Sequence, residues 1–205
     1  MLRLRAILLL AALVLACLVA PASAAERVDG LPEIRQFSSG RFEYALTVGG
    51  EIHAYGNGTF ESLARIAYIY GETGDQPSIQ YYLAYDGELY SHDEGQSEWT
   101  KLEGQAAPIP RPSYDAVALL AQRGTVSRIG DADVAGTPTT QYQIWVNDSG
   151  AATAGPLKVD LFVGKDTPYV YKLQITAGDA PDQIGAVYRF YDLDSNIVVP
   201  VPPAD

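Results

Sequence analysis

The sequence predicts a mainly β (α+β) protein, built as a curved antiparallel sheet with one short helical insertion that covers one side. Most segments between residues 41 and 194 alternate apolar and polar side chains with a period of two, as a half-buried strand does. Tight turns such as Gly49–Gly50 and Asp86–Gly87 join neighbouring segments and are typical of antiparallel hairpins. Only residues 113–124 have helical spacing, so a parallel sheet of βαβ units is not expected.

The first half of the sheet is predicted to be a meander of strands rich in tyrosine. Residues 41–48 place Phe42, Tyr44 and Leu46 on one face. The return strand, residues 51–62, has two glycines in its interior, which predicts strong bending or the close approach of another part of the backbone.

The clearest hairpin covers residues 78–92, and its first strand places Ile79, Tyr81 and Leu83 on one face. Shorter strands are expected on either side of this hairpin, at residues 63–72 and 97–104.

Prolines interrupt the strand pattern in "QAAPIPRPSY", residues 105–114, and exclude regular structure there. The helical signature follows directly. Ser113 is the expected N-cap, Val117 and Leu120 can share one face, and Gly124 marks the expected end. Because this helix is short, tertiary packing rather than intrinsic propensity must stabilise it.

Strands resume after the helix, and "TQYQIWV" places Tyr142, Ile144 and Val146 on one face. The strands of this second half are expected at residues 125–136, 140–148, 157–164, 169–177 and 184–194. Each has one apolar side, so one surface of the sheet is expected to be apolar throughout.

Residues 1–24 have the features of an export signal, with two arginines before an apolar stretch and a small-residue cleavage pattern that ends at Ala24. A second route is open, because "VLAC" resembles a bacterial lipobox. Residues 1–16 would then be a lipoprotein signal and Cys17 the lipidated first residue. In either case residues 25–205 are expected to form a single domain that is extracellular, periplasmic or on the outer face of the cytoplasmic membrane.

Cys17 is the only cysteine, so the exported domain is expected to fold without disulfides and to depend on a packed core. Removal of residues 1–24 takes away two of the 14 basic residues and none of the 25 acidic ones, which leaves 12 against 25 and a net charge of −13. This acidity argues against nucleic acid and anionic membrane surfaces as partners. Membrane association is expected only through a Cys17 anchor, and the protein is expected to be a monomer outside a larger complex.

No nucleophile, zinc-protease or phosphate-binding motif is found, so the sequence predicts no catalytic residues, no cofactor and no enzyme activity. "HDEG" at His92 could suggest a metal site, but its spacing fits no ligand set, and a solvated loop is the favoured interpretation. "DLDSN" at residues 192–196 imitates the start of a calcium loop. It lacks the glycine and the glutamate that such a loop requires, so a bend followed by a short strand at 197–199 is expected instead.

Taken in order, the segments resemble the LolA/LolB-like lipoprotein-carrier superfamily and, within it, LppX- and LprG-like exported lipoproteins. The stretches that carry the resemblance are "YALTVGGEIHAYGNGTF", "YDGELYSHDEGQSEWTKL", "YDAVALLAQ", "DVAGTPTTQYQIWV", "LFVGKDTPYVYKLQI" and "YRFYDLDSNIVVPVP". The resemblance implies a half-barrel of antiparallel strands whose concave face, partly covered by helices, holds acyl chains. This chain departs from the family pattern in having one helical segment where the family has several.

The resemblance therefore implies a carrier that binds a lipid, an acyl chain or a lipoprotein, with another envelope protein as a further partner. An acyl site needs volume rather than polar motifs, because burial of each CH₂ contributes about 0.8 kcal/mol. The candidate ligand-binding residues are those on the apolar sides of three strands: Phe42, Tyr44, Leu46, Ile79, Tyr81, Leu83, Tyr142, Ile144 and Val146.

Two alternatives remain open at this point. The first is a structural or accessory subunit of a cell-envelope complex, with the same fold and a filled core. The second is a secreted carbohydrate-binding protein that uses surface tyrosines and Trp99.

Overall fold

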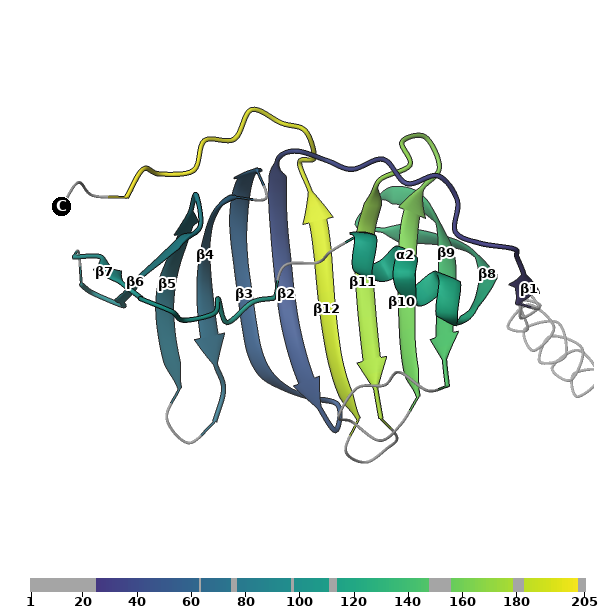
Figure 1. The fold of residues 1–205 in the computed structure, drawn as a ribbon, viewed down its shortest axis with the longest axis horizontal. Helices are drawn as coiled ribbons and strands as arrows, with labels where there is room; N and C mark the ends of the chain where they lie inside the picture. Colours follow the sequence, from purple (N-terminus) through teal and green to yellow (C-terminus); the bar gives the residue numbers. More distant parts are fainter. Residues whose placement is uncertain are drawn as a thin grey trace, which may run out of the picture.

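The computed structural model describes residues 25–62, 64–74, 77–96, 98–110, 114–147, 156–178 and 183–202. The predicted signal, with Cys17, and the predicted N-cap Ser113 lie outside these ranges. The described residues form one open antiparallel sheet of 12 strands and one helix, α2 (Figure 1). The predicted mainly β fold, a curved half-barrel with a short helix, is thereby confirmed.

The sheet has the order β1-β8-β9-β10-β11-β12-β2-β3-β4-β5-β6-β7. The first seven strands are β1 (Glu26–Arg27), β2 (Gly40–Val48), β3 (Glu51–Ser62), β4 (Arg65–Glu72), β5 (Ser78–Tyr85), β6 (Glu88–Asp93) and β7 (Thr100–Lys101). The remaining five are β8 (Thr125–Val134), β9 (Thr137–Val146), β10 (Leu157–Gly164), β11 (Val170–Ala177) and β12 (Ile184–Tyr191).

The middle of the sheet is the pair β12–β2, in which Phe190 lies opposite Phe42 and Tyr188 opposite Tyr44. Strands β2 to β7 form one consecutive meander and strands β8 to β12 form another. The ladder between β12 and β2 therefore joins two half-sheets that are far apart in the sequence.

The predicted hairpin turns are confirmed by their backbone angles. Gly49 and Gly50 have φ of 58° and 88°, and Asp86 and Gly87 have φ of 49° and 97°. Two successive positive φ values give a turn whose twist matches that of the flanking strands. These glycines are therefore required by the turns.

Helix α2 (Tyr114–Arg123) begins one residue after the predicted N-cap. It ends where the amide of Gly124 donates to the carbonyl of Leu120 at 2.9 Å, as the sequence predicted. The helix and the preceding residues 102–110, here called the covering segment, pass over the same side of the sheet (Figure 1). We call this side the inner face and the opposite side the outer face.

The short strand expected at 97–104 is present, and among the described residues it comprises only Thr100–Lys101, which form β7. One local prediction is wrong. Residues 197–199 form no strand, because the chain turns at Asp192 and Asp194, with φ of 51° and 53°, and leaves the ladder. Val199 instead packs on the outer face against Leu83, where it is 1% exposed.

Candidate functional site

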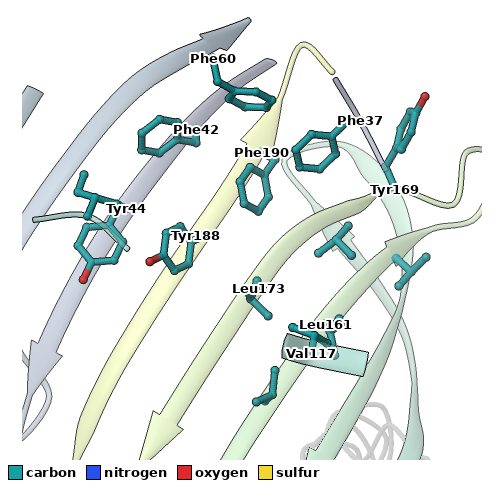
Figure 2. Packing of buried hydrophobic residues seen from close by; sticks show 14 of the residues in the cluster. Phe37, Phe42, Tyr44, Phe60, Val117, Leu161, Tyr169, Leu173, Tyr188 and Phe190 are labelled. Carbon is teal, nitrogen blue, oxygen red and sulfur yellow. The ribbon is translucent and has the colours of Figure 1, made fainter. Parts of the chain in front are cut away.

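The inner face of the sheet has two halves that differ in what covers them. Over β8–β11, helix α2 supplies Val117, which belongs to the same buried cluster as Leu161 and Ile144 (Figure 2). Leu161 and Ile144 are 0% exposed. Side chains alone fill this half, as in an ordinary protein core.

The other half, formed by β12 and β2–β5, is covered by the thinner covering segment and by Phe37. Ile109 of the covering segment packs directly above Gly56, where a Cβ atom would lie only 2.6 Å from its Cδ1. The hydroxyl of Tyr188 donates to the carbonyl oxygen of Pro110 at 2.7 Å. The close backbone approach expected at the β3 glycines comes from the neighbouring strand β4, through the carbonyl oxygens of Ile69 and Ala67. The covering segment approaches Gly56 with the side chain of Ile109.

A cavity lies between this cover and the sheet. Among the described residues, its wall consists only of apolar and aromatic residues. They come from β2–β5 and β12, from the covering segment, from α2 and from the N-terminal segment. They are Phe37, Phe42, Phe60, Ile66, Tyr68, Ala84, Ala107, Ile109, Pro110, Tyr114, Tyr188 and Phe190. The empty space between them is about 620 Å³, part of it open to solvent, and a water-sized sphere can move its centre through about 50 Å³. The cavity is therefore narrow.

Phe37 closes one end of the cavity. Its ring centroid lies 5.3 Å from that of Phe60, 5.1 Å from Phe190 and 5.6 Å from Tyr114 (Figure 2). Such tilted and edge-on contacts are favourable for aromatic pairs. Phe37 thereby joins the N-terminal segment to the sheet and to the start of α2.

Asp194 fixes the backbone beside Phe37, in an arrangement that we call the Asp194 junction. Its carboxylate accepts the amide hydrogen of Ser38 at 2.8 Å and the hydroxyl of Tyr169, and Arg35 lies 3.8 Å away. The hydrogen bond from Tyr169, followed by that from the Ser38 backbone, lowers the pKa of Asp194. The bend predicted at residues 192–196 therefore holds the segment that closes the cavity.

The Asp194 junction is expected to weaken in acid. Because the folded pKa of Asp194 lies below its unfolded value of about 3.9, its stabilising contribution is complete above that pH and is lost as the pH falls through the folded pKa. Hydrogen exchange of the Ser38 amide, corrected for intrinsic exchange rates, should show protection falling below about pH 4. In Asp194→Asn, protection should be weaker at neutral pH and should lack this acid-induced fall. An unchanged acid response in Asp194→Asn would contradict the assignment.

The nine predicted ligand-binding residues are divided between the two faces. Six lie on the inner face: Phe42, Tyr44, Leu46, Tyr142, Ile144 and Val146. Of these, Phe42 lines the cavity, and Tyr44 is next to it, with its ring centroid 4.9 Å from that of Tyr188. Tyr142, Ile144 and Val146 belong to strand β9 of the other half of the sheet and do not line the cavity.

Ile79, Tyr81 and Leu83 lie on the outer face, so the expectation of one shared apolar surface is wrong for these three. Their inner-face neighbours on β5 are Tyr82 and Ala84, of which Ala84 lines the cavity. Leu83 is buried under Val199. Period two shows which residues share a side, but it does not show which side faces inward.

His92 and Trp99, which the sequence raised as candidate metal and carbohydrate residues, lie together on the outer face. The His92 ring stacks on Tyr81 with centroids 4.6 Å apart and meets the edge of Trp99 at 4.5 Å. Trp99 is half-buried against the cluster of Leu83 and Tyr90. His92 thus packs between two aromatic rings.

The cavity residues missed from the sequence have two origins: some lie outside the predicted strands, and others, such as Tyr188 and Phe190, lie on predicted strands that were not chosen as binding strands. Phe37 precedes the first long strand, and Ile109 lies between two prolines. Phe60 and Tyr68 follow the glycine-containing stretch of β3, and Ala84 is too small to attract attention. The two glycines of β3 were the available signal, since they marked the point where another segment approaches.

Chemically, this arrangement can bind an apolar chain. Among the residues that the structure describes, no charged side chain lines the cavity. Burial raises the pKa of Tyr114 and of Tyr188, so both phenols stay neutral across the physiological range. Among the described residues, no helix has the length and apolarity that a membrane crossing needs.

No family model matches the chain, and no curated protein matches it by sequence. Solved structures do resemble it. LprF from Mycobacterium bovis is 13% identical with a TM-score of 0.52, and the match covers 81% of this chain and 90% of LprF. LppX from Mycobacterium tuberculosis, a lipoprotein, is 12% identical with a TM-score of 0.43, and the match covers 80% of this chain and 90% of LppX. A LolA superfamily protein from Nitrosomonas europaea is 10% identical with a TM-score of 0.35, and the match covers 80% of this chain and 89% of that protein.

The likeness to LprF shows that the two chains share a fold. The half-barrel that the resemblance implied is therefore confirmed as the fold of this chain.

Proposed function

We propose that this chain, which has the LprF-like fold, is a carrier that binds a lipid or the acyl chains of a lipoprotein between its sheet and its covering segment. One observation carries the proposal: every residue that lines the inner-face cavity is apolar or aromatic. Such a surface gains about 25 cal/mol for each Å² of apolar area that a ligand removes from water. It offers no charged group for a polar substrate.

The shape of the cover supports reversible loading. At its start, the covering segment is tied to β6 by the amide of Leu102, which donates to the carbonyl oxygen of Leu89 at 2.8 Å. Beyond Leu102 it forms no ladder with the sheet, and it is held by the packing of Ile109 and by the hydrogen bond from Tyr188 to Pro110. A segment with few backbone hydrogen bonds can open at low free-energy cost. The cavity is narrow when closed, so a bulky ligand would enter by displacing this segment rather than by unfolding the sheet.

Organic extraction of the purified, natively folded protein tests the proposal directly. We expect mass spectrometry of the extract to show lipid in a fixed ratio to protein, and lipid added to stripped protein to raise its thermal unfolding midpoint. An extract without lipid, together with no thermal shift for any added lipid class, would refute lipid binding.

The narrow cavity also favours one alternative, an accessory subunit of a cell-envelope complex with a filled core. The small volume open to a water-sized sphere, about 50 Å³, is the observation behind it. A protein partner that co-purifies in a stable ratio, without lipid, would favour this function over that of a carrier.

We further propose that residues 1–24 direct export and that Cys17 carries the lipid anchor if the lipobox is used. The intact mass of the mature protein separates the two routes. A chain that begins after Ala24 indicates simple secretion, and a chain that begins at an acylated Cys17 indicates anchoring.

A further inference from the structure

The hydroxyl of Tyr114 differs in its hydrogen bonding from three other tyrosine hydroxyls of the described structure. Tyr188 donates to the carbonyl of Pro110, Tyr82 to Gln80, and Tyr169 to Asp194. The hydroxyl oxygen of Tyr114 is fully enclosed and has no hydrogen-bond partner among the described residues. A buried polar group without a partner carries its full desolvation cost, so natural proteins rarely keep one without a use.

Tyr114 is also part of the cavity wall. It is the first residue of α2, lies where the covering segment meets the helix, and contacts Phe37 edge-on with an interplanar angle of 80°. Phenylalanine would satisfy this packing equally well, because the contact involves only the ring. The hydroxyl therefore adds nothing to the described packing.

We propose that the Tyr114 hydroxyl donates a hydrogen bond to an oxygen of the bound ligand, and that the ligand is an acyl ester whose carbonyl group reaches this end of the cavity. The inference rests on the proposed function and names the class of lipid. A neutral phenol enclosed by apolar walls is a donor without a competing acceptor, and an ester carbonyl is an acceptor that costs little to bring out of water. A free fatty acid would bring an ionised carboxylate into a site whose described wall holds no cation, at a high desolvation cost.

The position of Tyr114 orients the ligand. Tyr114 contacts Phe37 edge-on, and the wall of the same cavity includes residues of β3–β5. The ester group would lie under the start of α2, and the hydrocarbon chain would run beneath Ile109 along Phe60, Tyr68 and Ala84. One donor thus fixes the depth to which the chain enters.

The test compares Tyr114→Phe with the matched variant Tyr188→Phe, which lines the same cavity but whose hydroxyl already has an acceptor in Pro110. The natively folded protein, stripped of lipid, is loaded with the apolar fluorescent dye N-phenyl-1-naphthylamine. The dye is then displaced by methyl decanoate or by dodecane, which have chains of equal length. The readout is the ratio of the two displacement constants, together with the thermal unfolding midpoint of each ligand-free variant.

We expect Tyr114→Phe to weaken the binding of methyl decanoate by about two- to tenfold, which is the range of one net hydrogen bond. The binding of dodecane should be unchanged. The same variant should raise the ligand-free unfolding midpoint, because it removes an unpaired buried hydroxyl. Tyr188→Phe should lower that midpoint and leave the ratio unchanged.

An unchanged ratio in Tyr114→Phe, as would follow if the hydroxyl binds only water, overturns the inference while the proposed lipid binding stands. An equal loss of affinity for both compounds also overturns the inference, since the change would then not depend on the ester group. If neither compound displaces the dye from the unmodified protein, the binding of acyl chains in this cavity fails as well.

Discussion

Replacement of Ala84 by leucine is expected to reduce acyl-chain binding at least about tenfold while the protein stays folded. Ala84 lies on β5 at the floor of the cavity and is 4% exposed. The longer side chain would occupy space that the ligand needs. Displacement of two CH₂ groups from the cavity costs about 1.6 kcal/mol, which is more than tenfold in affinity. Dye displacement and lipid retention through purification both measure the effect.

Ala45→Leu is the matched control, because Ala45 lies on the outer face of β2 opposite Tyr55 and Val187. It should leave lipid binding unchanged. If Ala84→Leu lowers stability, Ala107→Leu provides the same occlusion from the covering segment, where the backbone can adjust. Undiminished binding in a folded Ala84→Leu or Ala107→Leu protein would mean that the ligand lies elsewhere.

A substitution of Gly58 by alanine is expected to lower the free energy of unfolding by about 3 kcal/mol. A Cβ atom at this position would lie 2.4 Å from the carbonyl oxygen of Ala67 and 2.5 Å from Cβ of Tyr68. Both neighbours belong to the adjacent strand β4, and Tyr68 is buried, so neither can move away without disturbing the ladder. Urea denaturation followed by circular dichroism measures the loss.

Gly30→Ala is a suitable control, because a Cβ atom at Gly30 would meet nothing within 4 Å. We expect its stability to change by less than about 0.5 kcal/mol. Equal stability of Gly58→Ala and Gly30→Ala would show that β3 and β4 are less closely packed than the structure indicates.

The fold was largely predictable because it follows from short-range patterns. Period two in "RFEYALTV" and "LKVDLFV" predicted strands, and Asp86–Gly87 predicted a turn whose geometry only a few residue types adopt. The prediction of a strand at residues 197–199 was wrong because long-range contacts override the local pattern there. Their β-branched side chains suit a strand, but the turn at Asp194 directs them away from the ladder, and Val199 finds its burial on another strand.

The site was less predictable, because it depends on which side of each strand faces inward and on what covers it. Phe42 lines the cavity, and Tyr44 packs beside it, because the β12–β2 pair lies at the centre of the inner face. Tyr81 and Ile79 have an equally regular pattern on the outer side. Tertiary contacts determine which of these residues face the cavity. The main one is the packing of Ile109 over Gly56, which sequence spacing does not encode.

The β12–β2 ladder also has a consequence for biogenesis. Arg41 pairs with Tyr191, so the middle of the sheet cannot form until synthesis has passed residue 191. Until then each nascent meander exposes an unpaired edge, and contacts of such long sequence separation form slowly. A chaperone that shields the edge of β2 from aggregation would therefore act before β12 is synthesised. The inner-face cavity, which needs residues of β12, would be among the last features to form.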